Sequence, residues 1–194
     1  GASGTLIASA NTGVVGITLT DGAINSNTVW KAQFPYIISS EFLVSENITL
    51  TINPGVIMKV KPGIRILVDG TLNAVGTADK KIYFTDFSDD SVGGDTNGDG
   101  DTTAPAAGGW SGILVGYSKD GNANLEYCVL KYGGAPWGGW NHYNAPVIVN
   151  GGGNVAIKNS ELSYSRLYGI RIEATGNINL ENNTFKNNGS HGVF

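Results

Sequence analysis

Two segments near the C-terminal end decide the fold: NVAIKNSELSYSRLYG, residues 154–169, and NINLENNTFKNNGSHG, residues 177–192. They superimpose at an offset of 23 residues, which aligns Ile157 with Leu180, Asn159 with Asn182, Leu162 with Phe185 and Gly169 with Gly192. Internal repetition at about 20–25 residues indicates stacked supersecondary units. A strand–helix–strand crossover takes about 30 residues or more. Each repeat is therefore predicted to form one turn of a parallel β-solenoid.

The same repeat extends toward the N-terminus. NLEYCVLKYGG, from Asn124, places Leu125, Tyr127 and Leu130 at the aligned positions. TLNA at 71–74 repeats TLTI at 49–52 with an offset of 22. Alternation of apolar and polar residues predicts strands, with these side chains facing inward: Leu50, Ile52, Val56, Met58, Val60, Ile64, Ile66 and Val68.

Composition narrows the class of protein. Only 14% of the 194 residues are charged and the net charge is −4, which argues against disorder and against a nucleic-acid partner. No apolar run reaches 18 residues, so no membrane span is predicted. Cys128 is the one cysteine, which excludes an internal disulfide, and it is expected to be a half-buried small residue rather than a reactive thiol.

The repeats divide the chain into two parts. Residues 1–36 are the least regular and are predicted to form an N-terminal cap, with Trp30 and Phe34 covering the end of the core. Residues 37–194 are predicted to form the rungs, interrupted by loops at 86–109 and 135–144. The chain stops as a new rung begins, so we expect a C-terminally truncated solenoid whose uncapped end could associate end to end.

Several motifs carry a family resemblance, and they cover residues 25–134 almost continuously: NTVWKAQFPYIIS, ITLTINPGVIMKV, DGTLNAVGTADKKIYFTD, GGDTNGDGD followed by GGWSGILV, and LEYCVLKYGG. The chain resembles right-handed parallel β-helix proteins of the pectin lyase-like superfamily, and most of all the modules of large bacterial secreted and surface proteins. The resemblance implies an all-β, right-handed parallel β-helix (β-solenoid), an extracellular location at the bacterial cell surface and a polysaccharide-rich setting. It does not imply an activity.

The loop at 86–109 has the composition of a calcium site. Its run DTNGDGD, residues 95–101, fits the first half of a calcium-binding loop, in which alternate side chains supply oxygens. Ala106 stands where the helix–loop–helix version has a bidentate Glu, so Asp86, Asp89, Asp90 or backbone carbonyls would complete the site. A solvated acidic loop and a catalytic calcium are the alternatives. The predicted structural Ca²⁺ ligands are Asp95, Asn97, Asp99, Asp101, Asp89 and Asp90.

The loop at 135–144 is rich in aromatic residues. Aromatic faces stack on sugar rings, and polar neighbours can bind hydroxyl groups. The candidate ligand-binding residues are Trp137, Trp140, His142 and Tyr143. The alternative is that these rings fold back and seal the solenoid wall.

The sequence favours a non-catalytic module over an enzyme. Glycosidases need facing carboxylates about 5–9.5 Å apart, and lyases need a carboxylate–calcium cluster beside a base. Polygalacturonases of this fold carry the motifs R-I-K and G-H-G. Arg171-Ile172-Glu173 and Ser190-His191-Gly192 match these motifs only imperfectly, so no catalytic residue is predicted. We expect a calcium-stabilised module for polysaccharide binding or cell-surface adhesion, whose partner is a polysaccharide or cell-wall glycan. The alternatives are a lyase or hydrolase acting on an acidic polysaccharide such as pectin, and a purely structural stalk.

Overall fold

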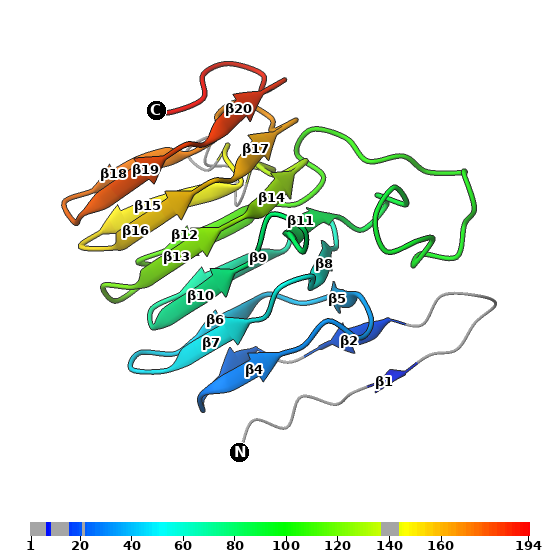
Figure 1. The fold of residues 1–194 in the computed structure, drawn as a ribbon, viewed down its shortest axis with the longest axis horizontal. Coiled ribbons are helices and arrows are strands. Elements are labelled where there is room, and N and C mark those ends of the chain that lie inside the picture. Colours follow the sequence, from blue (N-terminus) through cyan, green and yellow to red (C-terminus); the bar gives the residue numbers. More distant parts are fainter. Residues whose placement is uncertain (1–6, 9–15, 21, 137–143) are drawn as a thin grey trace.

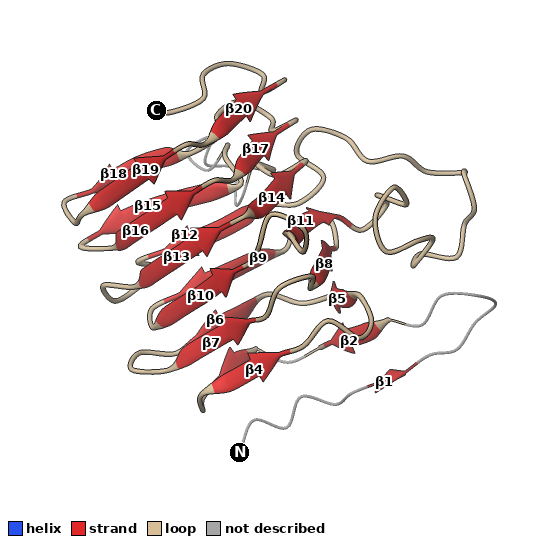
Figure 2. Ribbon diagram, in the orientation of Figure 1, coloured by secondary structure: helices blue, strands red, loops and turns tan. Residues whose placement is uncertain are grey.

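The computed structural model describes residues 7–8, 16–20, 22–136 and 144–194. Every regular element among these residues is a strand (Figure 2). The strands stack as successive coils from the N-terminal to the C-terminal end (Figure 1). The chain is therefore an all-β parallel β-helix, as the repeats predicted. No helix of the described residues is long and apolar enough to cross a membrane.

Three sheets form the walls. Sheet A contains β1 (Ile7–Ala8), β2 (Ile17–Leu19), β5 (Tyr36–Ile38), β8 (Ile57–Val60), β11 (Ile82–Asp86), β14 (Cys128–Lys131), β17 (Glu161–Ser163) and β20 (Thr184–Lys186). Sheet B contains β3 (Ala23–Ile24), β6 (Phe42–Val44), β9 (Arg65–Val68), β12 (Gly112–Val115), β15 (Val147–Gly151) and β18 (Arg171–Ala174). Sheet C contains β4 (Thr28–Trp30), β7 (Thr49–Ile52), β10 (Thr71–Val75), β13 (Asn122–Glu126), β16 (Asn154–Lys158) and β19 (Ile178–Glu181).

From β2 onward the chain visits sheets A, B and C in turn, so each round is one coil of the solenoid. The strand pairs between these coils are parallel, whereas β1 pairs with β2 antiparallel. The register confirms the repeat alignment: Ile157 lies opposite Leu180, Leu162 opposite Phe185, Leu125 opposite Ile157, and residues 71–74 opposite 49–52.

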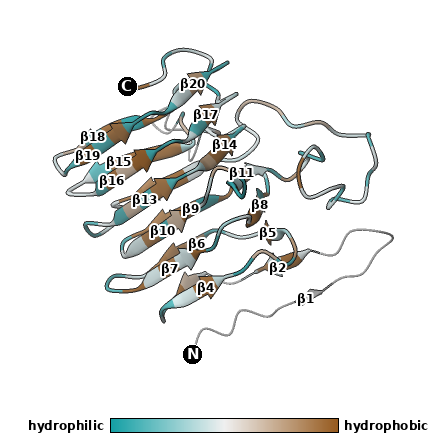
Figure 3. Ribbon diagram, in the orientation of Figure 1, coloured by the Kyte–Doolittle hydropathy of each residue, from teal (hydrophilic) through white to brown (hydrophobic). Residues whose placement is uncertain are grey.

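The inward face of each coil forms one continuous hydrophobic core. All the side chains predicted to face inward are buried except Ile64, which is partly buried and packs against the same core. Apolar bands mark the strands, whereas the corners and the loop after β11 are more hydrophilic (Figure 3). Since one coil cannot enclose its own apolar face, the core exists only because coils stack.

Two corners of the coil require a left-handed backbone. At the corner between sheets C and A, Tyr127, Asn159 and Asn182 have φ of 49°, 50° and 53°. At the corner that follows sheet A, the equivalent positions are held by Tyr132, Tyr164 and Asn187, with φ of 62°, 54° and 53°. Asn tolerates this conformation better than most side chains do, which explains its recurrence at the repeat positions.

The N-terminal residues take part in the coils. Strands β2, β3 and β4 already join sheets A, B and C. Trp30 is buried and stacks on Tyr36 with ring centroids 4.7 Å apart. Phe34 is 47% exposed, so the prediction that it covers the core is wrong, because it lies in the corner between β4 and β5 rather than on an inward strand position. The cap boundary at residue 36 stays a prediction.

Cys128 begins β14 and is more deeply buried than expected, with 1% exposure. Its N–H donates to Ser160 Oγ at 2.9 Å, and the N–H of Ser160 donates to Asn183 Oδ1 at 3.0 Å. These three residues occupy the same repeat position in successive coils. Burial raises the pKa of the Cys128 thiol, which is consistent with a packing role.

Candidate functional site

The acidic insertion, residues 86–109, leaves sheet A at the end of β11 and extends from the wall of the solenoid (Figure 1). Part of it returns to the outer face of sheet A. A Cβ on Gly93 would lie 2.9 Å from Cγ of Pro35 and 3.4 Å from Cγ2 of Ile57, so the chain approaches the wall as closely as a glycine allows. The insertion is therefore anchored on the coils that contain β5 and β8.

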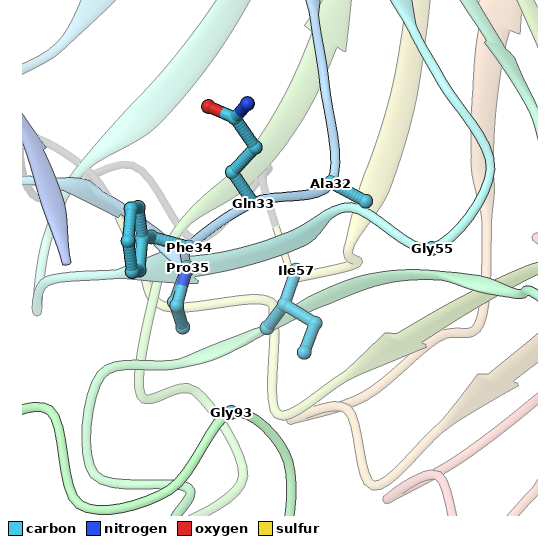
Figure 4. A pocket seen from close by; sticks show the side chains of 7 residues that line it. All are labelled: Ala32, Gln33, Phe34, Pro35, Gly55, Ile57 and Gly93. Carbon is cyan, nitrogen blue, oxygen red and sulfur yellow. The ribbon is translucent and has the colours of Figure 1, made fainter. Parts of the chain in front are cut away.

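A small hollow of about 160 Å³ marks this contact. In Figure 4 the side chains of Pro35 and Ile57 point toward Gly93, whereas Phe34 and Gln33 point away. Sites for small molecules usually measure about 300–1,000 Å³. This hollow has room for little more than one side chain, so we do not assign it a ligand.

Three carboxylates of the insertion converge. Asp90, Asp95 and Asp99 each offer an oxygen, and these oxygens all lie within 4.8 Å of one another. We call these residues the aspartate cluster. Their spacing explains the convergence, because the loop folds tightly between Asp95 and Asp99 and brings this turn back against Asp90.

Backbone N–H groups hold the central carboxylate in place. Asp95 accepts hydrogen bonds from the N–H groups of Gly98 at 2.7 Å, Gly100 at 2.8 Å and Asp99 at 3.3 Å. The bond from Gly100 is the main cause that lowers the pKa of Asp95. Gly98 and Gly100 have φ of 75° and 64°, a conformation that glycine adopts without strain. The glycines of DTNGDGD thus shape the turn that positions the carboxylate.

Three oxygens at this turn are buried without a hydrogen-bond partner: Asp90 Oδ1, Thr96 Oγ1 and Asp99 Oδ1. Buried polar atoms are normally paired with protein, water or an ion. Oxygen ligands of this kind suit hard cations such as Ca²⁺, which takes 6–8 oxygens at about 2.3–2.6 Å. The residues present therefore fit a calcium ion, with three carboxylates at the centre of the donor set.

A cation that the sequence analysis overlooked lies directly below the cluster. Lys59, on β8, is fully buried; its Nζ donates to the carbonyl oxygen of Gly94 and lies 3.6 Å from Asp90 Oδ1. Burial lowers the pKa of Lys59, and the charges of Asp90 and Asp89 partly oppose this shift. Alternation in IMKV could have placed Lys59 on the outer face of sheet A. It could not have shown that the insertion covers this lysine.

The other predicted ligands lie outside the aspartate cluster. Asp89 is buried and accepts hydrogen bonds from Oγ1 of Thr85 at 2.6 Å and from the hydroxyl of Ser91. Burial raises the pKa of Asp86, whose carboxylate accepts the N–H of Ser88. Asn97 Nδ2 donates to Asp99 Oδ2 at 3.0 Å, and Asp101 is exposed. The six predicted metal ligands thus divide into a convergent group of three and three residues outside that group, Asp89, Asn97 and Asp101.

The aromatic candidates Trp137, Trp140, His142 and Tyr143 lie outside the described residues. The described ends of this loop, Ala135 and Asn144, are buried. The ligand-binding role predicted for the four aromatic residues stays a prediction.

Comparisons with known proteins add little to this geometry. Protein bark beetle of Drosophila melanogaster is 46% identical to this chain over 57 residues, a match that covers 29% of this chain and 2% of that protein. No family model matches the chain. No solved structure is significantly similar to it.

Proposed function

We propose that the chain is a non-catalytic, calcium-stabilised module of an extracellular protein, and that it binds polysaccharide or mediates adhesion at a bacterial cell surface. We further infer membership of the pectin lyase-like superfamily. The stacked parallel coils support this inference, as do the motifs between residues 25 and 134. Long solenoid walls present extended surfaces, which suit a polymer better than a small molecule.

The single observation that carries the calcium part is the aspartate cluster, together with the buried oxygens of Thr96 and Asp99 that have no hydrogen-bond partner. Three carboxylates so close together repel one another, and one lysine cannot neutralise all three. A structural Ca²⁺ held by Asp90, Asp95 and Asp99 would remove this repulsion and give the buried oxygens of Thr96 and Asp99 a partner. It would also fix the insertion against sheet A, because Asp90 and Gly94 already contact Lys59 there.

Thermal unfolding tests the calcium part. Only the folded insertion assembles the aspartate cluster, so bound calcium stabilises the folded state by mass action. We expect a higher Tm in millimolar calcium than in EGTA, with magnesium giving a smaller shift. Equal melting temperatures in calcium and EGTA would contradict the proposal.

Retention on immobilised polysaccharides tests the binding part, with release of reducing or unsaturated ends followed in the same samples. Retention without product is expected. Product that accumulates with time would instead favour the lyase or hydrolase alternative. The absence of both retention and product would favour a structural stalk.

A further inference from the structure

The outer face of sheet A continues beyond the insertion as a row of polar side chains. Lys131, Ser163 and Lys186 lie in register on β14, β17 and β20. The next residue in each coil stands at the left-handed corner, where the chain places Tyr132, Tyr164 and Asn187. This part of the wall combines aromatic rings with cations.

The two tyrosines form a stacked pair at the surface. Their ring centroids are 5.4 Å apart with an interplanar angle of 29°, and Tyr164 is 38% exposed. Both residues have positive φ, a conformation that is unfavourable for residues other than glycine. Asn187 shows that the same corner accepts the residue type that this conformation favours. The two rings therefore stand side by side at a corner whose backbone would accept asparagine, with the ring of Tyr164 open to solvent.

Two cations beside the tyrosine pair have no ion-pair partner within the part of the chain that the structure describes. Glu161 is already engaged, because it pairs with Lys186 at 2.9 Å and accepts the hydroxyl of Ser163 at 2.7 Å. Lys131 precedes Tyr132, and Arg166 follows Tyr164 by two residues at the exposed corner. Lys131 and Arg166 are therefore placed to meet an external anion.

Three carboxylates lie near these cations, and of these Glu161 is paired with Lys186 and also feels the charge of Lys131. Asp86 and Asp89 are the acidic groups whose fields reach Tyr132, and both are buried and hydrogen-bonded. The stem of Arg166 packs beside the end of the acidic insertion, because a Cβ on Gly108 would lie 3.5 Å from its Cβ and Cδ. This contact holds the aliphatic part of the Arg166 side chain next to the corner.

We propose that Tyr132 and Tyr164, flanked by Lys131 and Arg166, form the contact site for an anionic sugar polymer. The tyrosine faces stack on sugar rings, Arg166 pairs with a carboxylate or sulfate through its planar fork, and Lys131 adds a point charge. The inference rests on the proposed polysaccharide-binding function. It assigns that function a surface and a class of polymer.

The experiment replaces each tyrosine with asparagine, as Tyr132→Asn, Tyr164→Asn and the double variant. Asparagine removes the ring while relieving the backbone strain, and Asn187 already occupies this position one coil further on. The matched control is Tyr127→Asn, since Tyr127 has the same left-handed conformation at the other corner and Asn159 and Asn182 are its equivalents. Urea unfolding of all the variants checks that the fold is retained.

Binding is measured on immobilised polygalacturonate, dextran sulfate and unsubstituted dextran at one calcium concentration. We expect the double tyrosine variant to lose at least tenfold in affinity for the anionic polymers, and Tyr127→Asn to stay within twofold. Lys131→Gln with Arg166→Gln should weaken binding at low salt and flatten its salt dependence. Because the chain carries a net charge of −4, its overall charge does not attract an anionic polymer.

The binding results test the tyrosine site, the class of polymer and the polysaccharide-binding function separately. Retention on an anionic polymer that the tyrosine variants leave unchanged would overturn this site while sparing the proposed function. Retention on dextran alone would overturn the anionic class. Retention on no polymer would overturn both the site and the polysaccharide-binding function. Preference between polygalacturonate and dextran sulfate distinguishes carboxylate from sulfate recognition.

Discussion

Lys59 Nζ lies 3.6 Å from Asp90 Oδ1, and this ion pair joins a coil of the solenoid to the acidic insertion. The lysine is fully buried, whereas the Asp90 side chain keeps 23% of its exposure. The same ammonium donates to the carbonyl of Gly94. A single cation from β8 therefore both docks the insertion and partly neutralises the aspartate cluster.

Replacing this lysine with an apolar side chain should destabilise the fold and increase its response to calcium. In Lys59→Met the carbonyl of Gly94 and the carboxylate of Asp90 lose their partner, which costs about 1–3 kcal/mol for a group left unpaired. Calcium can supply the missing positive charge, so the loss should shrink in millimolar calcium. Urea unfolding in calcium and in EGTA measures both effects. Lys81→Met, at an exposed position, is the control. An identical calcium response in Lys59→Met and the wild type would argue against coupling between Lys59 and the metal.

Asp95→Asn should abolish most of the calcium-dependent rise in Tm. Asp95 is the member of the cluster that backbone N–H groups hold in place, and the amide removes its charge while keeping its size. Asp101→Asn removes the same charge from an exposed residue outside the cluster, so it should retain the rise. Equal loss in the two variants would mean that net charge, rather than a defined site, causes the calcium effect.

Gly121→Ala should weaken the stack of coils. A Cβ on Gly121 would lie 2.0 Å from the carbonyl oxygen of Val68, which already accepts the N–H of Gly116 at 2.9 Å. Overpacking of this kind costs about 1–3 kcal/mol. Gly22→Ala is the control, because its Cβ would meet nothing within 4 Å. That variant should be neutral or more stable by up to about 1 kcal/mol. Denaturant unfolding compares the two, and equal stabilities would show that the backbone yields at this corner.

The Cys128 thiol should make the fold less stable at alkaline pH. Burial raises its pKa above the ordinary value of about 8.5, so above that pH only the unfolded state releases the proton. The contribution of Cys128 to the free energy of unfolding is fully present below about pH 8.5. It declines as the pH rises, by about 2 kcal/mol at pH 10.

Cys128→Ser isolates this effect. Ser160 occupies the same repeat position in the next coil, so serine should fit, and its hydroxyl can donate to the carbonyl of Ala74 as the thiol does. The difference in unfolding free energy between the wild type and Cys128→Ser should therefore change from pH 7 to pH 10. A constant difference would show that the thiolate is not excluded from the folded state.

The repeats predicted more of the fold than of the site. The repeat of residues 154–169 in 177–192 predicted the strand register, since neighbouring coils of a solenoid repeat the same local geometry. Inward positions followed from alternation. The prediction that Phe34 covers the core was wrong because this residue lies in an irregular corner. Side chains there do not alternate between the two faces of a strand.

For the candidate site, the sequence predicted the residue types but not their arrangement. The pattern DTNGDGD indicated oxygen ligands and the glycines that turn the loop, but it did not indicate which carboxylates converge. Whether Asp89 joins Asp90 or bonds to Thr85 depends on where the insertion meets sheet A. The repeat alignment places Tyr132 at the position of Tyr164, since Leu130 aligns with Leu162, but it did not show that the two rings stack.

By itself the sequence determined the all-β solenoid, its coil length, its inward face and the acidic character of one loop. These properties depend on periodicity, and a period is visible in one dimension. Tertiary structure alone decided that Lys59 lies beneath the insertion, that Asp90, Asp95 and Asp99 converge, and that the rings of Tyr132 and Tyr164 stack. Such contacts join irregular segments to distant coils, and their energies depend on separations of a few ångströms that no spacing along the chain encodes.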